Sequence, residues 1–254
     1  MEDNLRMAAD LLREAEYAVA LTGAGISTPS GIPDFRSPGT GLWEEVRPMF
    51  VASIWAFRLR PRAFYDWMRP LAHKILEAEP NAAHRALADL EAAGRLKAVI
   101  TQNIDGLHQA AGSQQVLELH GHTRTATCLD CGRTVDTGPL IEEFLAGKVP
   151  RCASCGGLLK PDVVLFGEML PANVFLAAQM ECEQCDLLLV AGSSLGVVPA
   201  SELPLVALEA GADLVIVNLE PTLLDSQARV VIGCDVATAL PAIVEEVLGE
   251  PSQL

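Results

Sequence analysis

The clearest chemistry in this sequence belongs to four cysteines in two Cys-x-x-Cys pairs twenty residues apart, Cys128 with Cys131 and Cys152 with Cys155. Two turns that each present a pair of thiolates are typical of a tetrahedral four-cysteine zinc site. Two disulfides, or pairs that arose by chance, are the alternative interpretation. Gly132 and Gly156 follow the pairs, where the chain must fold back on the metal. We expect a structural zinc ion, because four thiolates leave no coordination position open to water.

A glycine-rich turn, Gly23-Ala24-Gly25-Ile26-Ser27, directly follows the apolar run 17–22. A buried strand that leads into such a turn is where α/β sheets bind phosphate groups. The full GxGxxG fingerprint is absent, because position 28 is Thr. Tight packing of the turn without any ligand explains these glycines equally well, so the motif alone leaves the question open.

Polar side chains also follow a second apolar run, residues 97–101: these are Gln102, Asn103 and Asp105. Further along, His120 stands directly before a glycine, between a strand-like run and a loop. The unperturbed pKa of histidine lies near neutral pH, as a general base requires. Spacing alone leaves a catalytic and a structural role open for this histidine.

The stretch between residues 30 and 76 interrupts this pattern. Glycines and prolines make 30–46 a predicted long loop, and long loops in compact domains usually have a function. The loop offers Asp34, Phe35 and Arg36 as an acid, an apolar plate and a cation. Aromatic residues then cluster over 50–76, where we expect helices whose aromatic side chains form a core.

The rest of the chain alternates between segments with the hydrophobic pattern of helices and short apolar runs typical of buried strands. Predicted helices cover 4–15, 80–94, 172–183, 201–210 and 236–248, and predicted strands cover 17–22, 97–101, 186–191, 213–217 and 230–232. This alternation predicts an α/β fold with a Rossmann-like, doubly wound parallel sheet. The polar clusters all lie at the carboxyl ends of the predicted strands, where such sheets bind ligands, so we expect a dinucleotide there.

Two insertions suggest a smaller second domain. We predict a Rossmann-like domain from residues 1–35, 77–122 and 164–254. The composite small domain, with a helical lobe and the zinc ribbon, takes 36–76 and 123–163.

The composition narrows the partners. A net charge of −15 argues against direct nucleic-acid binding. No apolar run approaches the ~20 residues of a membrane span, and the charged N-terminal stretch does not look like a signal peptide. Seven cysteines, four of them in zinc-site spacing, suit a reducing cytoplasm.

These motifs together resemble the sirtuin family of NAD-dependent protein deacylases, over nearly the whole chain. The likeness rests on the turn 23–27, the two cysteine pairs and the stretches 31–36, 101–105, 120–121, 166–168, 192–194 and 218–220. It implies a cleft that binds NAD and an acyl-lysine peptide. The implied products are nicotinamide, free lysine and O-acyl-ADP-ribose.

The resemblance also implies roles for single residues. His120 would be the general base, and Asn103 and Asp105 would orient the nicotinamide end of NAD. The implied NAD contacts are Gly23, Ala24, Gly25, Asp34, Phe35, Arg36, Gln102, Asn103, Ile104, Asp105, Gly192, Ser193, Ser194, Asn218, Glu220, Asp235 and Val236. The implied substrate contacts are Val164 and Phe166 at the acyl-lysine, and Gly167, Glu168, Val197 and Val198 along the peptide.

The expected acyl group follows from one position at which this sequence differs from part of the family. Sirtuins that prefer succinyl or malonyl lysine resemble one another in a Tyr-x-x-Arg pair, but here Tyr65 is followed by Met68 and Arg69 comes one residue late. On a helix that residue lies about 100° around the axis. Neutral acyl groups, acetyl first, are therefore expected.

Other interpretations stay open. A protein ADP-ribosyltransferase would use the same NAD cleavage, and a non-catalytic module would bind NAD without turnover. A dehydrogenase is disfavoured, because the third glycine is missing and the zinc has no open position. A third Cys-x-x-Cys, Cys182 with Cys185, is expected to be a pair of buried thiols near a helix end.

Overall fold

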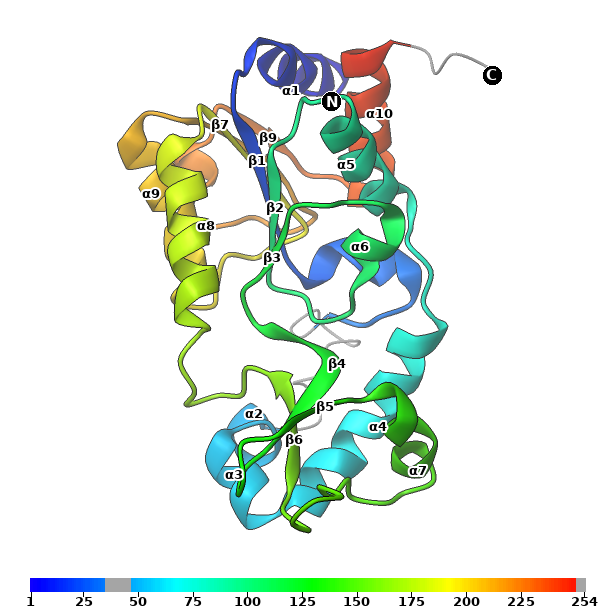
Figure 1. Ribbon diagram of the computed structural model, residues 1–254. Coiled ribbons are helices and arrows are strands. Elements are labelled where there is room, and N and C mark those ends of the chain that lie inside the picture. The colour runs from blue at the N-terminus through cyan, green and yellow to red at the C-terminus, as the bar shows by residue number, and fades with distance from the viewer. Residues whose placement is uncertain (35–46, 250–254) are drawn as a thin grey trace.

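The computed structural model describes residues 1–34 and 47–249, which form two parts, each built on its own sheet (Figure 1). The larger sheet is parallel throughout. Its strands run in the order β3 (Val116–Glu118), β2 (Ala98–Thr101), β1 (Ala18–Thr22), β7 (Leu187–Ala191), β8 (Asp213–Val217) and β9 (Val230–Ile232). The strand order therefore reverses between β1 and β7, which is where doubly wound sheets open a ligand crevice.

Helices cover both faces of this sheet (Figure 1). One face carries α1 (Glu2–Glu14), α5 (Ala82–Ala92) and α10 (Val236–Leu248), and the other carries α8 (Ala172–Gln184) and α9 (Leu203–Ala210). The central strands are consequently buried on both sides, which explains their continuous apolar sequences. The short helix α6 (Leu107–Ala111) follows β2. Single 3-10 turns lie at Ala24–Ile26, Thr28–Ser30, Gly138–Leu140, Ala200–Glu202 and Asp225–Gln227.

The smaller part is an antiparallel sheet with helices packed beside it. The sheet has the order β5 (Thr134–Asp136), β4 (Gly121–Cys128), β6 (Leu159–Val163), and the helices are α2 (Pro48–Val51), α3 (Ile54–Leu59), α4 (Pro61–Glu77) and α7 (Ile141–Leu145). Phe57, Phe64 and Tyr65 meet edge to face at centroid distances of 5.0, 5.8 and 5.4 Å, so these aromatics form a core as predicted. Phe50 and Trp55 do not, because they are 57% and 65% exposed.

The helix predicted over 80–94 is shorter than expected. It begins at Ala82 because Asn81 caps it: the Asn81 side chain accepts a hydrogen bond from the Ala83 amide at 2.9 Å. The backbone N–H of Asn81 in turn donates to His84 Nδ1 at 3.3 Å, which completes a capping box. No helix within 1–34 and 47–249 has the length and apolarity to cross a membrane.

Two histidines are buried behind the carboxyl edge of the larger sheet. The rings of His84 and His108 meet edge to face at 4.9 Å, and His108 Nε2 lies 2.9 Å from Thr22 Oγ1. Their other ring nitrogens, His84 Nε2 and His108 Nδ1, are buried without a hydrogen-bond partner among the described residues. Burial lowers the pKa of His84 to about 4 and that of His108 to about 3.

This pair predicts acid sensitivity of the fold. In the unfolded chain each imidazole has a pKa near 6.5, so below that pH the unfolded state binds protons that the folded state excludes. The contribution of the two neutral histidines to the free energy of unfolding is therefore fully present above pH 6.5. It decreases as the pH falls toward the pKa values of the folded state. Between pH 7 and pH 5 we expect a loss of about 2 kcal/mol for each histidine. Urea unfolding of wild type and His108→Gln at both pH values measures it, and equal pH dependence of the two proteins would contradict this origin.

Candidate active site

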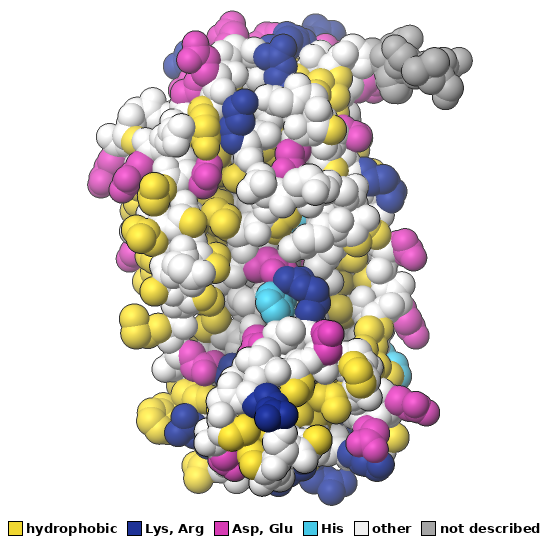
Figure 2. All heavy atoms as spheres, viewed as in Figure 1, with side chains coloured by type: hydrophobic (Ala, Val, Ile, Leu, Met, Phe, Trp, Pro, Cys, Tyr) yellow, Lys and Arg dark blue, Asp and Glu magenta, His cyan; other side chains and the backbone are white. Residues whose placement is uncertain are grey.

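A large cavity lies at the carboxyl edge of the parallel sheet and reaches into the smaller part. Its volume is about 1110 Å³, above the range of ~300–1,000 Å³ typical of small-molecule sites. Its walls come from the turns after β1, β2, β7, β8 and β9, from the loop after β6 and from α4 and α8. On the face seen in Figure 2, acidic and basic side chains are interspersed without a continuous basic patch.

The turns after β1 and β7 touch one another across the switch point. The Gly25 amide donates to Gly192 O at 2.8 Å, and the Gly23 amide donates to Ala191 O at 3.2 Å. Gly192 has φ +62°, and a Cβ there would lie 2.3 Å from the backbone nitrogen of Ile26. Tight packing thus requires these glycines, and the same turns line the cavity. The structure confirms the packing interpretation of the glycine-rich turn, and its place in the cavity wall keeps the phosphate-binding interpretation as a prediction.

A buried hydrogen-bond network connects the turns after β1 and β2. Asn103 Nδ2 donates to Gly23 O at 3.1 Å and to Ser27 Oγ at 3.0 Å. Ser27 Oγ then donates to Asp105 Oδ2 at 2.7 Å, and Asp105 Oδ1 accepts from the Leu107 amide at 2.9 Å. Burial raises the pKa of Asp105, and the hydrogen bonds from Leu107 and Ser27 oppose that rise. The network fixes Asn103 and Asp105 at the cavity wall.

His120 lies at the junction of the two sheets, half-buried and facing the cavity. Its Nδ1 is 2.8 Å from the carbonyl oxygen of Gln102. A carbonyl only accepts, so Nδ1 carries the proton and Nε2 keeps a free lone pair. Burial lowers the pKa of His120, while the bond to Gln102 opposes the shift. The ring is therefore neutral at pH 7, with Nε2 as a base.

The loop after β6, residues 164–168, joins this edge to the helical lobe. The Val164 amide donates to His120 O at 2.8 Å. Phe166 forms a parallel bridge with the segment before α3: its amide donates to Ala52 O at 2.9 Å, and its carbonyl accepts from the Ile54 amide at 3.0 Å. The loop thus places its backbone beside the histidine.

Comparison with known proteins now identifies the family. Residues 23–199 match the model described as Sir2 family. The chain belongs to the Sir2 family. It is 51% identical to "NAD-dependent protein deacylase 2" of Archaeoglobus fulgidus, over 97% of both chains.

Two solved structures are similar to the Sir2 chain described here. One, described as "Structural Basis for the Mechanism and Regulation of Sir2 Enzymes", has a TM-score of 0.93 at 50% identity and covers 98% of this chain and 99% of its own. Another, "The structure of Sir2Af2 bound to a myristoylated histone peptide", has a TM-score of 0.84 at 45% identity and covers 97% of each chain.

The Sir2 motif residues named from the sequence converge on the cavity. All three predicted catalytic residues, all six predicted substrate residues and every predicted NAD residue that the structure describes line its wall. Phe35 and Arg36 lie outside the described residues, whereas Asp34 is in the wall.

Sequence reasoning placed only Met68 on one side of the cavity and missed the other residues of that wall. Helix α4 contributes apolar side chains on one face, namely Phe64, Trp67, Met68, Leu71 and Ile75. Several of them also belong to the core of the smaller part, so interpreting the lobe's aromatics as core alone was incomplete. Their spacing of three or four residues was the available signal, because it places them on one helical face. Ser27 was named only as part of a motif, and its role in the network was not visible.

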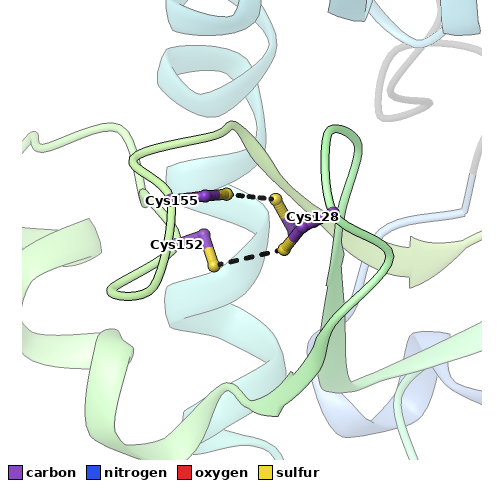
Figure 3. Close-up of side chains that lie close together, drawn as sticks. Cys128, Cys152 and Cys155 are labelled. Carbon is purple, nitrogen blue, oxygen red and sulfur yellow. Dashed lines mark hydrogen bonds between the residues drawn. The ribbon is translucent and has the colours of Figure 1, made fainter.

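The four predicted zinc ligands meet at one point of the smaller part. All four Sγ atoms lie within 4.8 Å of one another, and two pairs are 3.5 and 3.8 Å apart. Figure 3 shows Cys152 and Cys155 on one turn facing Cys128 on the other. A tetrahedral site with Zn–S bonds of about 2.3 Å needs sulfur atoms about 3.8 Å apart, so the cluster fits zinc. Backbone amides of Ser154 and Cys155 lower the pKa of Cys152, which favours its thiolate. The backbone hydrogen bond from Gly157 also lowers the pKa of Cys155, but the Cys131 and Cys128 thiols outweigh it, so the pKa of Cys155 is raised instead.

The third Cys-x-x-Cys is a pair of buried thiols near a helix end, as predicted. Cys182 and Cys185 are buried at the end of α8, and the Cys185 thiol donates to Cys182 O at 3.3 Å. Burial raises the pKa of both thiols to about 12, so they stay protonated and unreactive. Among the described residues, only Cys128, Cys131, Cys152 and Cys155 form a cluster that could hold a metal ion.

Proposed function

We propose that this protein is an NAD-dependent protein-lysine deacylase that transfers the acyl group of lysine to ADP-ribose. One observation carries the proposal: a single cavity contains a histidine whose Nδ1 is held by a carbonyl, the glycine turns at the switch point of a parallel sheet, and a loop whose backbone lies beside that histidine. NAD supplies the ribose carbon that accepts the acyl oxygen as nicotinamide leaves. The zinc ion has a structural role.

In this proposal the residues around β2 prepare the reaction. Asn103 and Asp105, fixed through Ser27, orient the nicotinamide end of NAD together with Ile104. His120 Nε2 accepts the proton of a ribose hydroxyl. Its geometry is held by Gln102 O, and the Gln102 side chain donates to Ser193 Oγ at 3.0 Å. The base and the phosphate-binding turn are thus directly linked.

The rest of NAD follows the carboxyl edge of the sheet. Gly23, Ala24 and Gly25 with Gly192, Ser193 and Ser194 take phosphate and ribose groups, Asn218 and Glu220 take the adenosine ribose, and Asp235 and Val236 border the adenine. Asp34, Phe35 and Arg36 are further proposed NAD contacts, of which Asp34 is in the described cavity wall. The amides of Gly23, Gly25 and Gly192 are hydrogen-bonded within the turns, so these glycines supply the close packing of the crevice. Ala24, Ser193 and Ser194 line the cavity beside them, which supports this placement.

The acyl-lysine enters between the loop 164–168 and Val197–Val198. Val164 and Phe166 line the lysine channel, and the peptide adds as a strand, which demands little of its sequence. Beyond the channel the wall from α4 is apolar. The myristoylated peptide named for the relative Sir2Af2 supports a site that accepts neutral acyl groups, including long ones.

Succinyl-lysine is expected to be a poor substrate, with kcat/KM at least about tenfold below that of acetyl-lysine. The described residues of the cavity wall include Met68 but no lysine or arginine, so they offer no cation to pair with a buried carboxylate. The Tyr65 hydroxyl already donates to Leu159 O at 2.6 Å, and the Arg69 side chain already donates to Phe144 O and Asp66. Neither group is therefore directed at the acyl carboxylate. Steady-state kinetics on paired peptides measure this. Met68→Arg should narrow the difference, and Met180→Arg on the exposed face of α8 should not. Equal rates in wild type would contradict the expectation.

The test of the proposed function is nicotinamide release from NAD, with and without an acetyl-lysine peptide, with mass spectrometry of the products. Peptide-dependent release with O-acetyl-ADP-ribose is expected. Protein-bound ADP-ribose without that product would favour the ADP-ribosyltransferase, and NAD binding without release would favour the non-catalytic module.

The proposal includes the organisation of the chain. The Rossmann-like domain takes 1–35, 77–122 and 164–254, and the small domain takes 36–76 and 123–163, which the two separate sheets support. Acyl-lysine proteins are the expected partners, in a cytoplasmic setting, without nucleic acid or membrane.

A further inference from the structure

Lys160 is a buried lysine directly beneath the loop that the peptide is proposed to pair with. It lies in β6, and its side chain is only 11% exposed. Nζ donates to Val163 O at 2.8 Å and to Pro161 O at 3.1 Å, and it lies 3.1 Å from Glu168 Oε2. An ammonium group has three donors, so this one is fully satisfied by the loop and its base. A buried charge persists in a fold only when it is paired in this way.

The partner carboxylate is folded back on its own loop. Glu168 Oε2 accepts a second hydrogen bond from the Leu165 amide at 2.9 Å, and the Glu168 amide donates to Leu165 O at 3.0 Å. The side chain therefore closes the turn 165–168 from inside. This differs from the role that the family resemblance implies, in which Glu168 clamps the peptide.

The closed turn fixes the position of the loop backbone that is proposed to pair with the peptide. Upstream, Val164 is bonded to the carbonyl of His120, and Phe166 is bonded to Ala52 and Ile54. The ion pair between Lys160 and Glu168 holds the other end of the loop, at residue 168. Without them the turn 165–168 loses two of its hydrogen bonds, and the extended segment is held on one side only.

We propose that the buried Lys160–Glu168 ion pair positions the substrate loop, and that Glu168 acts on the peptide through the loop backbone rather than by contact. The inference rests on the proposed deacylase function. Lys160 and Glu168 are positioning residues, and their loss raises KM for the acyl-peptide while KM for NAD changes little.

The test is a double-mutant cycle on peptide kinetics. Lys160→Met and Glu168→Gln are each expected to raise KM for an acetyl-lysine peptide roughly tenfold, and the double variant should be no worse than the poorer single variant, because both changes break one unit. Lys148→Met is the matched control. It breaks an ion pair of 2.9 Å with Glu143 in the same part of the chain, but that pair is exposed, so KM should not change.

A conservative variant and a second readout separate positioning from loss of fold. Lys160→Arg keeps the charge and is expected to restore most of the affinity. Hydrogen exchange of amides 165–168 should be faster in Lys160→Met and Glu168→Gln than in wild type or Lys148→Met, and it does not depend on turnover. If Lys160→Met does not fold, Glu168→Gln carries the test, because glutamine retains the volume and an acceptor for Leu165.

The outcomes are distinct. Wild type that releases no nicotinamide with peptide overturns the proposed function, while faster loop exchange in the variants would still support the ion pair's role. Active wild type with unchanged peptide KM and unchanged exchange in both variants overturns the positioning role. If KM rose only in Glu168→Gln and only for basic peptides, Glu168 would contact the peptide directly, and this result would also overturn the positioning role.

Discussion

Replacement of His120 by alanine is expected to lower kcat for deacylation by about 10²–10⁴-fold, the usual contribution of a general base. The reason is geometric: Nδ1 is held by the carbonyl of Gln102 at 2.8 Å, so Nε2 is the free basic atom in the cavity. Because His120 makes none of the contacts proposed for the phosphates or adenine, the affinity for NAD should remain. Product formation by mass spectrometry and NAD titration measure the two quantities separately.

The neighbouring histidine provides the control. His122 is two residues away and does not line the cavity, so His122→Ala should retain kcat. A fully active His120→Ala protein would contradict the assignment of the base. The pH profile adds a second check. Burial lowers the pKa of His120 below 6.5, and the active form is the neutral one, so the acid limb of kcat/KM should lie below pH 6.5 in wild type. Circular dichroism at each pH separates this limb from unfolding.

Removal of zinc is expected to disorder the sheet β5-β4-β6 and to abolish deacylation. The apolar core around the cysteines is very small, consisting of Ala126, Cys128, Cys152 and Leu159 with Val135 and Leu140 against it. Such a cluster cannot order three strands alone, whereas a structural zinc site contributes about 10–16 kcal/mol of binding free energy. The sheet's strand β6 leads into the substrate loop, so its loss removes the peptide site.

Cys128→Ser tests this without a chelator. We expect less than one zinc per chain by elemental analysis, a melting temperature lowered by several degrees and little activity. Cys182→Ala is the matched control, because this buried cysteine is outside the cluster, and it should retain one zinc. Cys128→Ser protein that contains no zinc yet melts and turns over like wild type would show that the metal is dispensable.

The elements themselves were largely predictable from the chain. The continuous apolar strands, as at Leu187–Ala191, and the amphipathic helices have distinct periodicities, so their alternation led to the parallel sheet. Boundaries were less certain, as at Asn81, where a side-chain cap rather than the preceding proline begins the helix. Caps compete locally, and the sequence does not show which one forms.

The site was predictable wherever its residues are neighbours in the chain. Most of the wall from α4 was not, because Phe64 and Leu71 are apolar residues that belong to a core and line a cavity at once. Only the position of the neighbouring sheet decides which part of such a side chain faces open space.

Spacing alone left the role of His120 open, but by itself the sequence determined the two cysteine pairs that the fold brings together and the strand–turn junctions that bear Gly23, Asn103 and Gly192. These follow from spacing along the backbone, which covalent geometry preserves in any fold. The tertiary structure alone decided that Ser27 meets Asp105 and that Lys160 meets Glu168. The direction of a side chain depends on the packing of elements distant in the chain, and spacing along the chain does not specify that packing.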